Sequence, residues 1–271
     1  MRKIVVGLFW TTLLSVVLYA GVSVSPVITE MVLPPGSSYE GRLAITNTGD
    51  TPVIIEAQIK GFTAPGGTPL ILDPAKDNYP YSGKDLLQIT PTQAKLGPNE
   101  MTYFEYKVQM PENLDPYGGR YVAVVFKIKP AVSEAQVVTV AQVASLFLLN
   151  PGGDVSPHFS IKRIEANQDP NDPRRVIIRS VIANDGNLHI NADQVCAMLH
   201  ILDNDGYIID QIPLRTHTML PGTEYTHTTY WLAPEDLPSG TYQIHLSVIL
   251  FGAIDKKAQH YFQQIATEFK F

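Results

Sequence analysis

The chain has 271 residues, of which 45% are hydrophobic and 17% are charged, and its formal net charge is −6. This length exceeds one typical domain and suffices for two domains that each bury a core. The composition excludes an intrinsically disordered chain, and nucleic acid is not expected as a partner because no basic stripe accompanies the acidic balance.

The amino terminus has the pattern of an export signal. Arg2 and Lys3 precede an apolar run through Ala20, and a cleavage edge stands before Gly21. We therefore expect a signal peptide over residues 1–20 and a mature protein that is periplasmic or extracellular at the cell surface, with no membrane span after cleavage. The alternative is an uncleaved anchor, since the apolar run of 17 residues is near the lower limit for spanning a bilayer.

One set of motifs occurs twice, in the same order. Each motif is a turn signal beside an alternating or β-branched run, which is typical of short antiparallel strands. The first copy contains Asn47-Thr-Gly49, Leu96-Gly97-Pro98, Met110-Pro-Glu-Asn-Leu114 and Gly119-Arg-Tyr121, and the second contains Asn184-Asp-Gly186, Leu220-Pro-Gly222, Ala233-Pro-Glu-Asp-Leu237 and Gly240-Thr-Tyr242. The repeat predicts an all-β chain of two tandem immunoglobulin-like β-sandwich domains after the signal peptide, over residues 21–150 and 155–271.

Turn residues delimit the expected strands. In the first domain these are 22–33, 41–46, 53–60, 101–108, 120–129 and 137–149, and in the second 158–166, 174–183, 195–202, 207–212, 225–232, 242–251 and 258–269. Asp203-Asn-Asp-Gly206 predicts a hairpin between two of them. Cys196 is the only cysteine, so no intrachain disulfide can form, and its strand-like surroundings predict a buried thiol.

The stretch between Gly61 and Thr90 has no counterpart of equal length in the second copy. Asn47 and Leu96 are 49 positions apart, whereas Asn184 and Leu220 are 36 apart. The extra residues predict a long surface excursion, which is either a contact loop or an insertion without a role.

Tyr121 and Tyr242 occupy matching positions at the start of a strand. Immunoglobulin-like sandwiches place a tyrosine at such a corner, with its hydroxyl bonded to nearby backbone, so we expect both residues to be structural.

The segment Val137–Leu149 is apolar on both of its faces. A sandwich strand ordinarily shows one face to water, so this segment is expected to be covered on two sides. One cover is the core of its own domain. The other is either the second domain or the strand of a partner chain.

These motifs resemble a known group of proteins. An exported chain of two sandwiches that opens with Val24-Ser-Pro-Val-Ile28 and carries Pro35-Gly36, Asn47-x-Gly49 and Gly119-x-Tyr121 is similar to the periplasmic pilus-chaperone (PapD-like) superfamily. Its first-domain pattern also resembles the WxL-interacting cell-surface proteins. The PapD-like resemblance implies that the last strand of the first domain, here Val137–Leu149, lends hydrophobic side chains to an incomplete subunit.

The chain departs from that group at one place. Pilus chaperones hold the terminal carboxylate of a client with a basic pair, one member from the opening strand and one from the last strand of the first domain. Residues 22–33 contain no Lys or Arg and only one charge, Glu30, while residues 137–149 contain no charge.

The sequence offers no catalytic motif and no complete metal site. It lacks a nucleophile elbow, a His-Glu-x-x-His pair and a phosphate-binding loop. His217 and His227 flank a turn that can bring them opposite each other, but two imidazoles are too few for zinc, and exposed strand histidines are the expectation. No cofactor, metal or catalytic residue is predicted.

The function expected from the sequence is protein binding without catalysis. The chain would act as a chaperone-like adaptor for surface or pilus-type proteins, with another exported protein as its client. The alternative is a structural subunit of a surface layer, sheath or filament that associates with itself. The residues expected to touch the partner are Val24, Val27, Val138, Val140, Ala144, Leu146 and Leu148.

Overall fold

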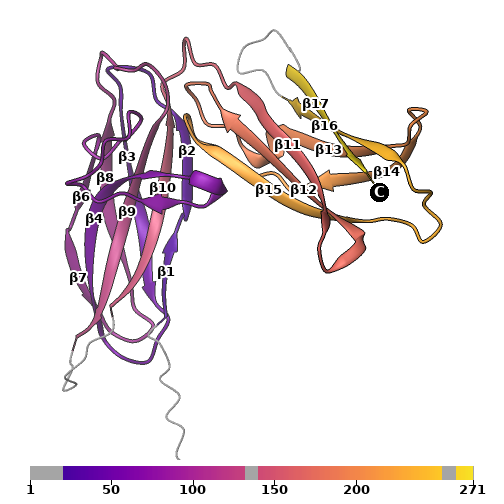
Figure 1. Ribbon diagram of the computed structural model, residues 1–271. Helices are drawn as coiled ribbons and strands as arrows, with labels where there is room; N and C mark the ends of the chain where they lie inside the picture. The colour runs from indigo at the N-terminus through magenta and orange to yellow at the C-terminus, as the bar shows by residue number, and fades with distance from the viewer. Residues whose placement is uncertain (1–20, 132–139, 252–260, 271) are drawn as a thin grey trace, which may run out of the picture.

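The computed structural model of the protein describes residues 21–131, 140–251 and 261–270. Nearly all of the regular structure is β-strand, and the strands form two sandwiches that meet at one end and diverge from there (Figure 1). The predictions of an all-β chain and of two tandem sandwiches are confirmed. The proposed signal peptide over residues 1–20 lies outside the described residues.

The first sandwich contains every strand up to Asn150. One sheet has the order β1-β3-β8-β6, with β1 at Val22–Ser25, β3 at Ser38–Asn47, β8 at Met101–Gln109 and β6 at Leu87–Thr90. The other has the order β2-β10-β9-β4, with β2 at Ile28–Val32, β10 at Ala141–Asn150, β9 at Arg120–Pro130 and β4 at Val53–Thr63; β5 (Leu70–Ile71) and β7 (Gln93–Leu96) also pair with β4. This is the strand order of an immunoglobulin-like sandwich.

The second sandwich contains the strands from Phe159 onward. Its smaller sheet has the order β11-β12-β15, with β11 at Phe159–Asp169, β12 at Asp172–Asn184 and β15 at Glu224–Leu232. Its larger sheet has the order β14-β13-β16-β17, with β14 at Ile208–Leu214, β13 at Val195–Leu202, β16 at Thr241–Leu250 and β17 at Tyr261–Lys270. On the basis of this strand pattern, residues 21–150 and 155–271 remain the proposed limits of the two domains.

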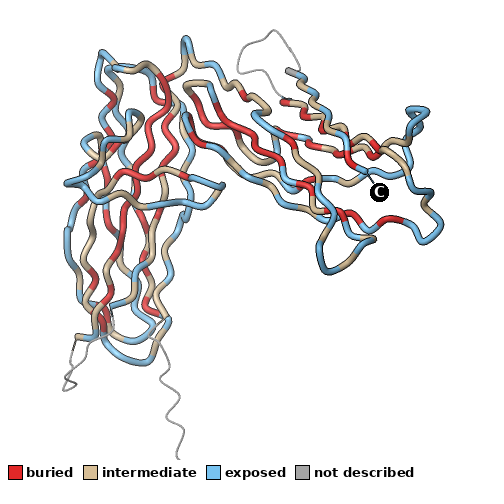
Figure 2. The backbone as a smooth tube through the Cα atoms, viewed as in Figure 1, coloured by how far each residue is buried: buried red, intermediate tan, exposed pale blue. Residues whose placement is uncertain are grey.

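Each sandwich has its own apolar core, visible as buried segments inside both pairs of sheets in Figure 2. In the first core the rings of Phe104 and Phe126 meet edge to face, with centroids 5.1 Å apart. In the second, Trp231 packs edge to face on Phe269 at 5.9 Å. Because no disulfide ties the sheets, this packing holds each pair together, as expected from the single cysteine.

The opening segment differs from the expected single strand over residues 22–33. Pro26 divides it into β1, which pairs with β3, and β2, which pairs with β10 in the opposite sheet. A proline has no N–H to donate to a ladder, so the chain leaves one sheet at this residue and enters the other. The opening segment therefore closes the sandwich along one side.

The repeated asparagine makes equivalent hydrogen bonds in both domains. Asn47 donates through Nδ2 to the carbonyls of Thr51 and Gly97, at 2.8 and 2.9 Å, and its Oδ1 accepts the N–H of Gly49. Asn184 donates to the carbonyls of Leu188 and Met219 at the same two distances, and accepts from Gly186. Both side chains are fully buried. The Asn-x-Gly motif thus ties the end of one strand to a turn that is distant in sequence.

The two matching tyrosines have different roles. The hydroxyl of Tyr242 donates to the carbonyl of Pro238 at 2.6 Å, four residues upstream, which confirms a tyrosine corner in the second domain. Tyr121 forms no such corner, because its hydroxyl contacts the second domain instead. The expectation that both bond to nearby backbone was therefore wrong for Tyr121.

Cys196 is exposed, contrary to the prediction of a buried thiol. Side chains alternate along β13, so Val195, Ala197 and Leu199 point into the core and Cys196 points outward. The apolar run around the cysteine did not reveal which of the two faces it occupies.

Among the residues that the structure describes, none form a helix with the length and hydrophobicity needed to span a bilayer.

Replacing Tyr242 by phenylalanine removes the corner hydrogen bond and keeps the ring. We expect Tyr242→Phe to lower the free energy of unfolding by about 1 kcal/mol, as for a typical intramolecular hydrogen bond. Urea denaturation followed by tryptophan fluorescence measures this change. The matched control is Tyr230→Phe, at an exposed ring of the same domain; equal effects of the two substitutions would contradict the role of the corner.

Candidate functional site

Strand β10 is apolar on both faces, and the structure covers each face differently. Phe147 and Leu149 point into the core of the first sandwich. Leu148 belongs to a separate cluster on the opposite face, together with Phe62, Tyr121 and other buried side chains. The prediction that both faces of this segment pack against other residues is confirmed for its carboxyl half.

The second cover combines an insertion of the first domain with a residue of the second. Leu220, which is 1% exposed, joins the cluster around Leu148 from the second domain, and Tyr79 packs against the cluster from the insertion. Of the two alternatives for the second cover, interdomain packing therefore holds at this end of β10. Leu148 itself is only 5% exposed, so this side chain has no surface left for a partner.

The insertion between Gly61 and Thr90 is a contact segment within the chain. It contains β5, β6 and the 3-10 turn η1 (Pro65–Gly67), and Figure 1 shows the β4–β5 hairpin reaching toward β15. A Cβ at Gly67 would lie 2.7 Å from the Cβ of His217, so the tip touches the second domain directly. Tyr79 donates its hydroxyl proton to the carbonyl of Pro221 at 2.9 Å. The insertion supports the second domain.

The same contact changes the expectation for two histidines. His217 and His227 are half-buried, and their rings flank Tyr225, with centroids 4.7 and 6.1 Å from the tyrosine ring. The prediction of exposed strand histidines was wrong for both, because His217 lies against the hairpin tip of the first domain and His227 is on the same face of β15 as the buried Trp231.

The amino half of β10 has no ladder partner along one edge in the described chain, although β1 of the opposite sheet lies near β10. Strand β2 pairs with β10 in parallel from Leu146 to Asn150, and the N–H of Leu146 donates to the carbonyl of Val27. On that side, residues 141–144 pair with no strand of the described chain. Val140, just before β10, is 43% exposed, and Ile28, which starts β2, is 60% exposed. An unpaired ladder edge thus lies between two exposed apolar side chains.

The residues expected to bind the partner are distributed over this region. Ala144 and Leu146 are half-buried on the cleft-facing side of β10, and Val27 is exposed at the start of β2. Val24 packs against the core of the first sandwich and Leu148 against the second domain, so both have packing roles. Val138 lies outside the described residues.

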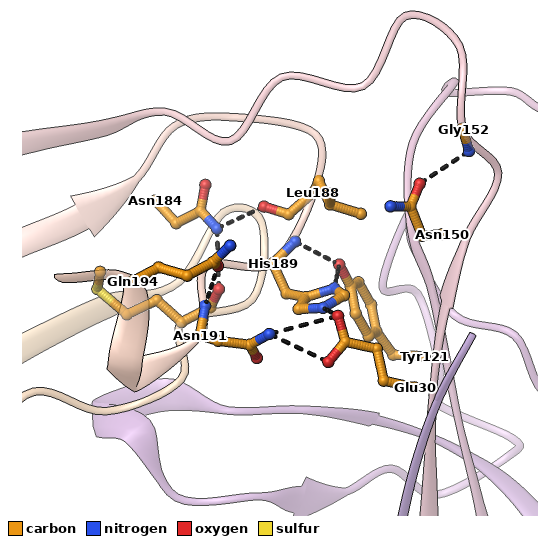
Figure 3. A network of polar contacts seen from close by, with 10 residues as sticks. Glu30, Tyr121, Asn150, Gly152, Asn184, Leu188, His189, Asn191 and Gln194 are labelled. Carbon is orange, nitrogen blue, oxygen red and sulfur yellow. Dashed lines mark hydrogen bonds and ion pairs between the residues drawn. The ribbon is translucent and has the colours of Figure 1, made fainter. Parts of the chain in front are cut away.

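A partly buried polar network joins the two domains (Figure 3). The N–H of His189 donates to the hydroxyl of Tyr121 at 2.8 Å, and the same hydroxyl lies 3.3 Å from Nδ1 of the ring. Nε2 of His189 lies 2.8 Å from Oε1 of Glu30 on β2. If the Tyr121 hydroxyl donates to Nδ1 of His189, the proton of the neutral ring is on Nε2. This N–H then donates to the carboxylate of Glu30. Every polar atom of the His189 ring therefore has a partner in the first domain.

Asn191 completes this network from the second domain. Its Nδ2 donates to both oxygens of Glu30, at 3.3 and 3.1 Å. The hydrogen bond from His189 is the main cause that lowers the pKa of Glu30 below its ordinary value, so the carboxylate is ionised at neutral pH. Burial raises the pKa of Tyr121 well above its ordinary value, which keeps the hydroxyl protonated.

A small cavity of about 110 Å³ lies in the cleft beside this network. Its apolar walls include Ile28 and Leu146 from the first domain and Leu220 from the second. Glu30 is the only charged side chain that lines it. The cavity is therefore an apolar slot with a single negative charge at its wall.

The sequence directed attention to β10 as the candidate binding strand but not to the residues of the cleft. Glu30 was recognised only as the single charge of the opening strand, and no role was predicted for His189 or Asn191. One signal was present, because a lone carboxylate in an otherwise uncharged segment requires a polar partner when it is partly buried. The identity of that partner depends on how the two domains dock.

Removing the Tyr121 hydroxyl is expected to loosen the domain junction. Tyr121→Phe leaves the buried N–H of His189 without an acceptor, which costs about 1–3 kcal/mol of unfolding free energy. Chemical denaturation measures the loss, and small-angle X-ray scattering is expected to show a larger radius of gyration. Tyr207→Phe, at an exposed ring, is the control; an unchanged scattering profile for Tyr121→Phe would contradict the bridging role.

The lowered pKa of Glu30 makes its contribution pH-dependent. A carboxyl whose pKa is depressed by folding stabilises the protein above its ordinary value of 4.5, and the contribution is lost as the pH falls through the lowered folded value. We expect the melting temperature of the wild type to exceed that of Glu30→Gln near neutral pH. The difference should shrink as the buffer is taken from about pH 6 to about pH 3. A difference that grows on acidification would contradict this assignment.

Comparisons with known proteins found likeness only among solved structures, since no family model and no curated protein matches the chain. The class 5 fimbriae chaperone CfaA is 16% identical, with a TM-score of 0.48 over 90% of this chain and 98% of its own. The YadV chaperone is 8% identical, with a TM-score of 0.45 over 92% and 99%. A structure of the Salmonella enterica SafA pilin in complex with the SafB chaperone gives 11% identity and a TM-score of 0.39 over 93% and 97%.

Two of these structures are chaperones, and the third is a complex of a pilin with a chaperone. Each match extends over nearly the whole solved chain at low identity.

Proposed function

We propose that this protein is an exported, non-enzymatic binding protein that holds another exported protein at the free edge of β10. It would act as a chaperone-like adaptor in the assembly of surface or pilus-type proteins. The observation that carries the proposal is the unpaired edge over residues 141–144, between the exposed side chains of Val140 and Ile28.

An open strand edge binds other strands because its N–H and C=O groups lack ladder partners. A partner strand laid along residues 141–144 would satisfy those groups, and its side chains would cover the apolar residues beside the edge. Fully burying one valine or isoleucine side chain contributes roughly 1.5–3 kcal/mol. Backbone pairing would provide affinity for many extended segments, and side-chain contacts would provide the choice among them.

The surrounding structure holds this edge in place. On its other side, β10 pairs with β9 from Ala141 to Leu149, and the hydroxyl of Ser145 donates to the carbonyl of Pro26 at 2.7 Å. The carboxyl half of β10 is fixed by the core of the first sandwich and by the separate cluster around Leu148. A partner would therefore meet a preformed edge and would not have to order it, which lowers the entropic cost of binding.

A second candidate function is self-assembly into a surface layer or filament, and one observation favours it. Strand β14 is the edge strand of the larger sheet of the second domain, and Tyr207, Ile208 and Ile209 are exposed there. An exposed apolar edge of this kind can pair with another copy. Concentration-dependent assembly of the purified protein, abolished by Ile208→Lys, would support this function, whereas a one-to-one complex with a distinct exported protein supports the adaptor.

The adaptor proposal is tested by placing a charge at the edge. We expect Val140→Asp to reduce capture of the exported client at least tenfold without changing the melting temperature, because Val140 contributes contact area at the edge and is not part of either core. Met101→Asp, at an equally exposed apolar residue of the opposite sheet, is the matched control. Capture is measured by photo-cross-linking from position 142, an exposed residue of the same edge, in the native envelope, followed by identification of the product.

The opposite result is equally clear. If the cross-link from position 142 yields no distinct exported protein, or if Val140→Asp captures as much client as Met101→Asp, then the edge of β10 is not the binding surface.

A further inference from the structure

The interdomain cleft contains one ionised group that faces an apolar cavity. The cavity of about 110 Å³ is lined by side chains of both domains, and Glu30 is the only charged residue among them. The side chain of Glu30 is 47% exposed. A partner that occupies the cleft therefore meets a carboxylate among apolar side chains.

The carboxylate is held in place but is not saturated. Its Oε1 binds His189 and Asn191, and its Oε2 binds Asn191 only. A carboxylate has about four acceptor sites on its two oxygens, so Oε2 can accept a further hydrogen bond. Among the ion pairs of the described residues, Glu30 has His189 as its only partner and contacts no lysine or arginine.

The cleft and the free edge of β10 adjoin each other. In the parallel ladder, Ile28 lies beside Leu146 and Glu30 lies beside Leu148, so Glu30 follows Ile28 on the same face of β2 by two residues. Two strand residues span about 7 Å, which is within reach of a long side chain. A bound segment that rises from the edge onto the cleft face of β2 would pass Ile28 and place its next side chain beside Glu30.

From this geometry we propose that Glu30 selects client segments that carry a lysine or arginine side chain at the end of their apolar strand. This inference rests on the proposed function, and it adds the chemistry of the partner. The charged nitrogen would donate to Oε2 of Glu30, while the stem of the side chain would lie on Ile28 and the cavity walls. The same carboxylate repels an acidic side chain or a terminal carboxylate at this place.

The shape and charge of the site favour a basic side chain over other occupants. An apolar side chain would fill the cavity but would bury the ionised carboxylate without a counter-charge, which is costly. A neutral polar group would supply the hydrogen bond without the charge. A basic side chain supplies both, and its long stem matches the apolar walls.

The test uses three synthetic peptides that differ at one position. Each is an acetylated and amidated segment of alternating valine and threonine, with lysine, norleucine or glutamate at its last strand position. Binding to the full chain is measured by fluorescence anisotropy at low salt. We expect the lysine peptide to bind about tenfold more tightly than the norleucine peptide, and the glutamate peptide to bind more weakly than both. Raising the salt concentration should reduce the preference for lysine.

Variants assign this preference to Glu30. Glu30→Gln retains an acceptor for His189 and should abolish the lysine preference, because lysine loses its counter-charge and norleucine no longer buries an ionised carboxylate. Glu105→Gln, at an exposed carboxylate on β8 in the opposite sheet, should leave the preference intact. Val140→Asp should weaken all three peptides together, because it changes the edge and not the cleft.

The outcomes separate the two proposals. Equal binding of the lysine and norleucine peptides, or a lysine preference that persists in Glu30→Gln, would overturn the role of Glu30 and leave the edge intact. If none of the peptides binds, or if Val140→Asp weakens none of them, the proposed edge fails and the inference fails with it.

Discussion

The two domains are joined at one buried hydroxyl. Tyr121 stands at the start of β9, where its counterpart Tyr242 binds a carbonyl of its own domain at 2.6 Å. The hydroxyl of Tyr121 instead accepts the N–H of His189 and lies against Nδ1 of the same ring. A residue that closes a corner in one copy of the module thus joins the modules in the other. Because His189 is 2% exposed, water cannot replace this partner.

This junction fixes more than the angle between the domains. The cluster around Leu148 is complete only when Leu220 of the second domain lies on it, and the carboxylate of Glu30 is held only by residues of the second domain. The second domain therefore shields the carboxyl half of β10 and leaves the amino half open. The opening over residues 141–144 begins where β2 and the second domain stop.

Much of the fold could be predicted because local sequence patterns determine its turns and strands. The Asn-x-Gly turns, the hairpin at Asp203-Asn-Asp-Gly206 and the alternating runs are local signals, and the repeat showed that there are two copies. The division at Pro26 was missed because the segment was assigned from its apolar pattern, and the proline was not weighed as a break. The face of Cys196 was missed because a run that is apolar on both sides carries no period.

The cleft could not be predicted, for a different physical reason. The contacts of Glu30 with His189 and Asn191 join residues 159 and 161 positions apart in different domains. Neither partner stands in a motif that distinguishes it from an ordinary loop residue. Their roles arise from the docking of two separately folded units, which depends on shape complementarity over the whole junction.

The point at which β2 joins β10 also limits how far any added strand can advance. The carbonyl of Val27 already accepts the N–H of Leu146, so an incoming backbone that moves along residues 141–144 meets an occupied position there. Its alignment is then determined by a physical stop as well as by matching side chains. A scaffold of this kind can hold segments of different sequence in one common register.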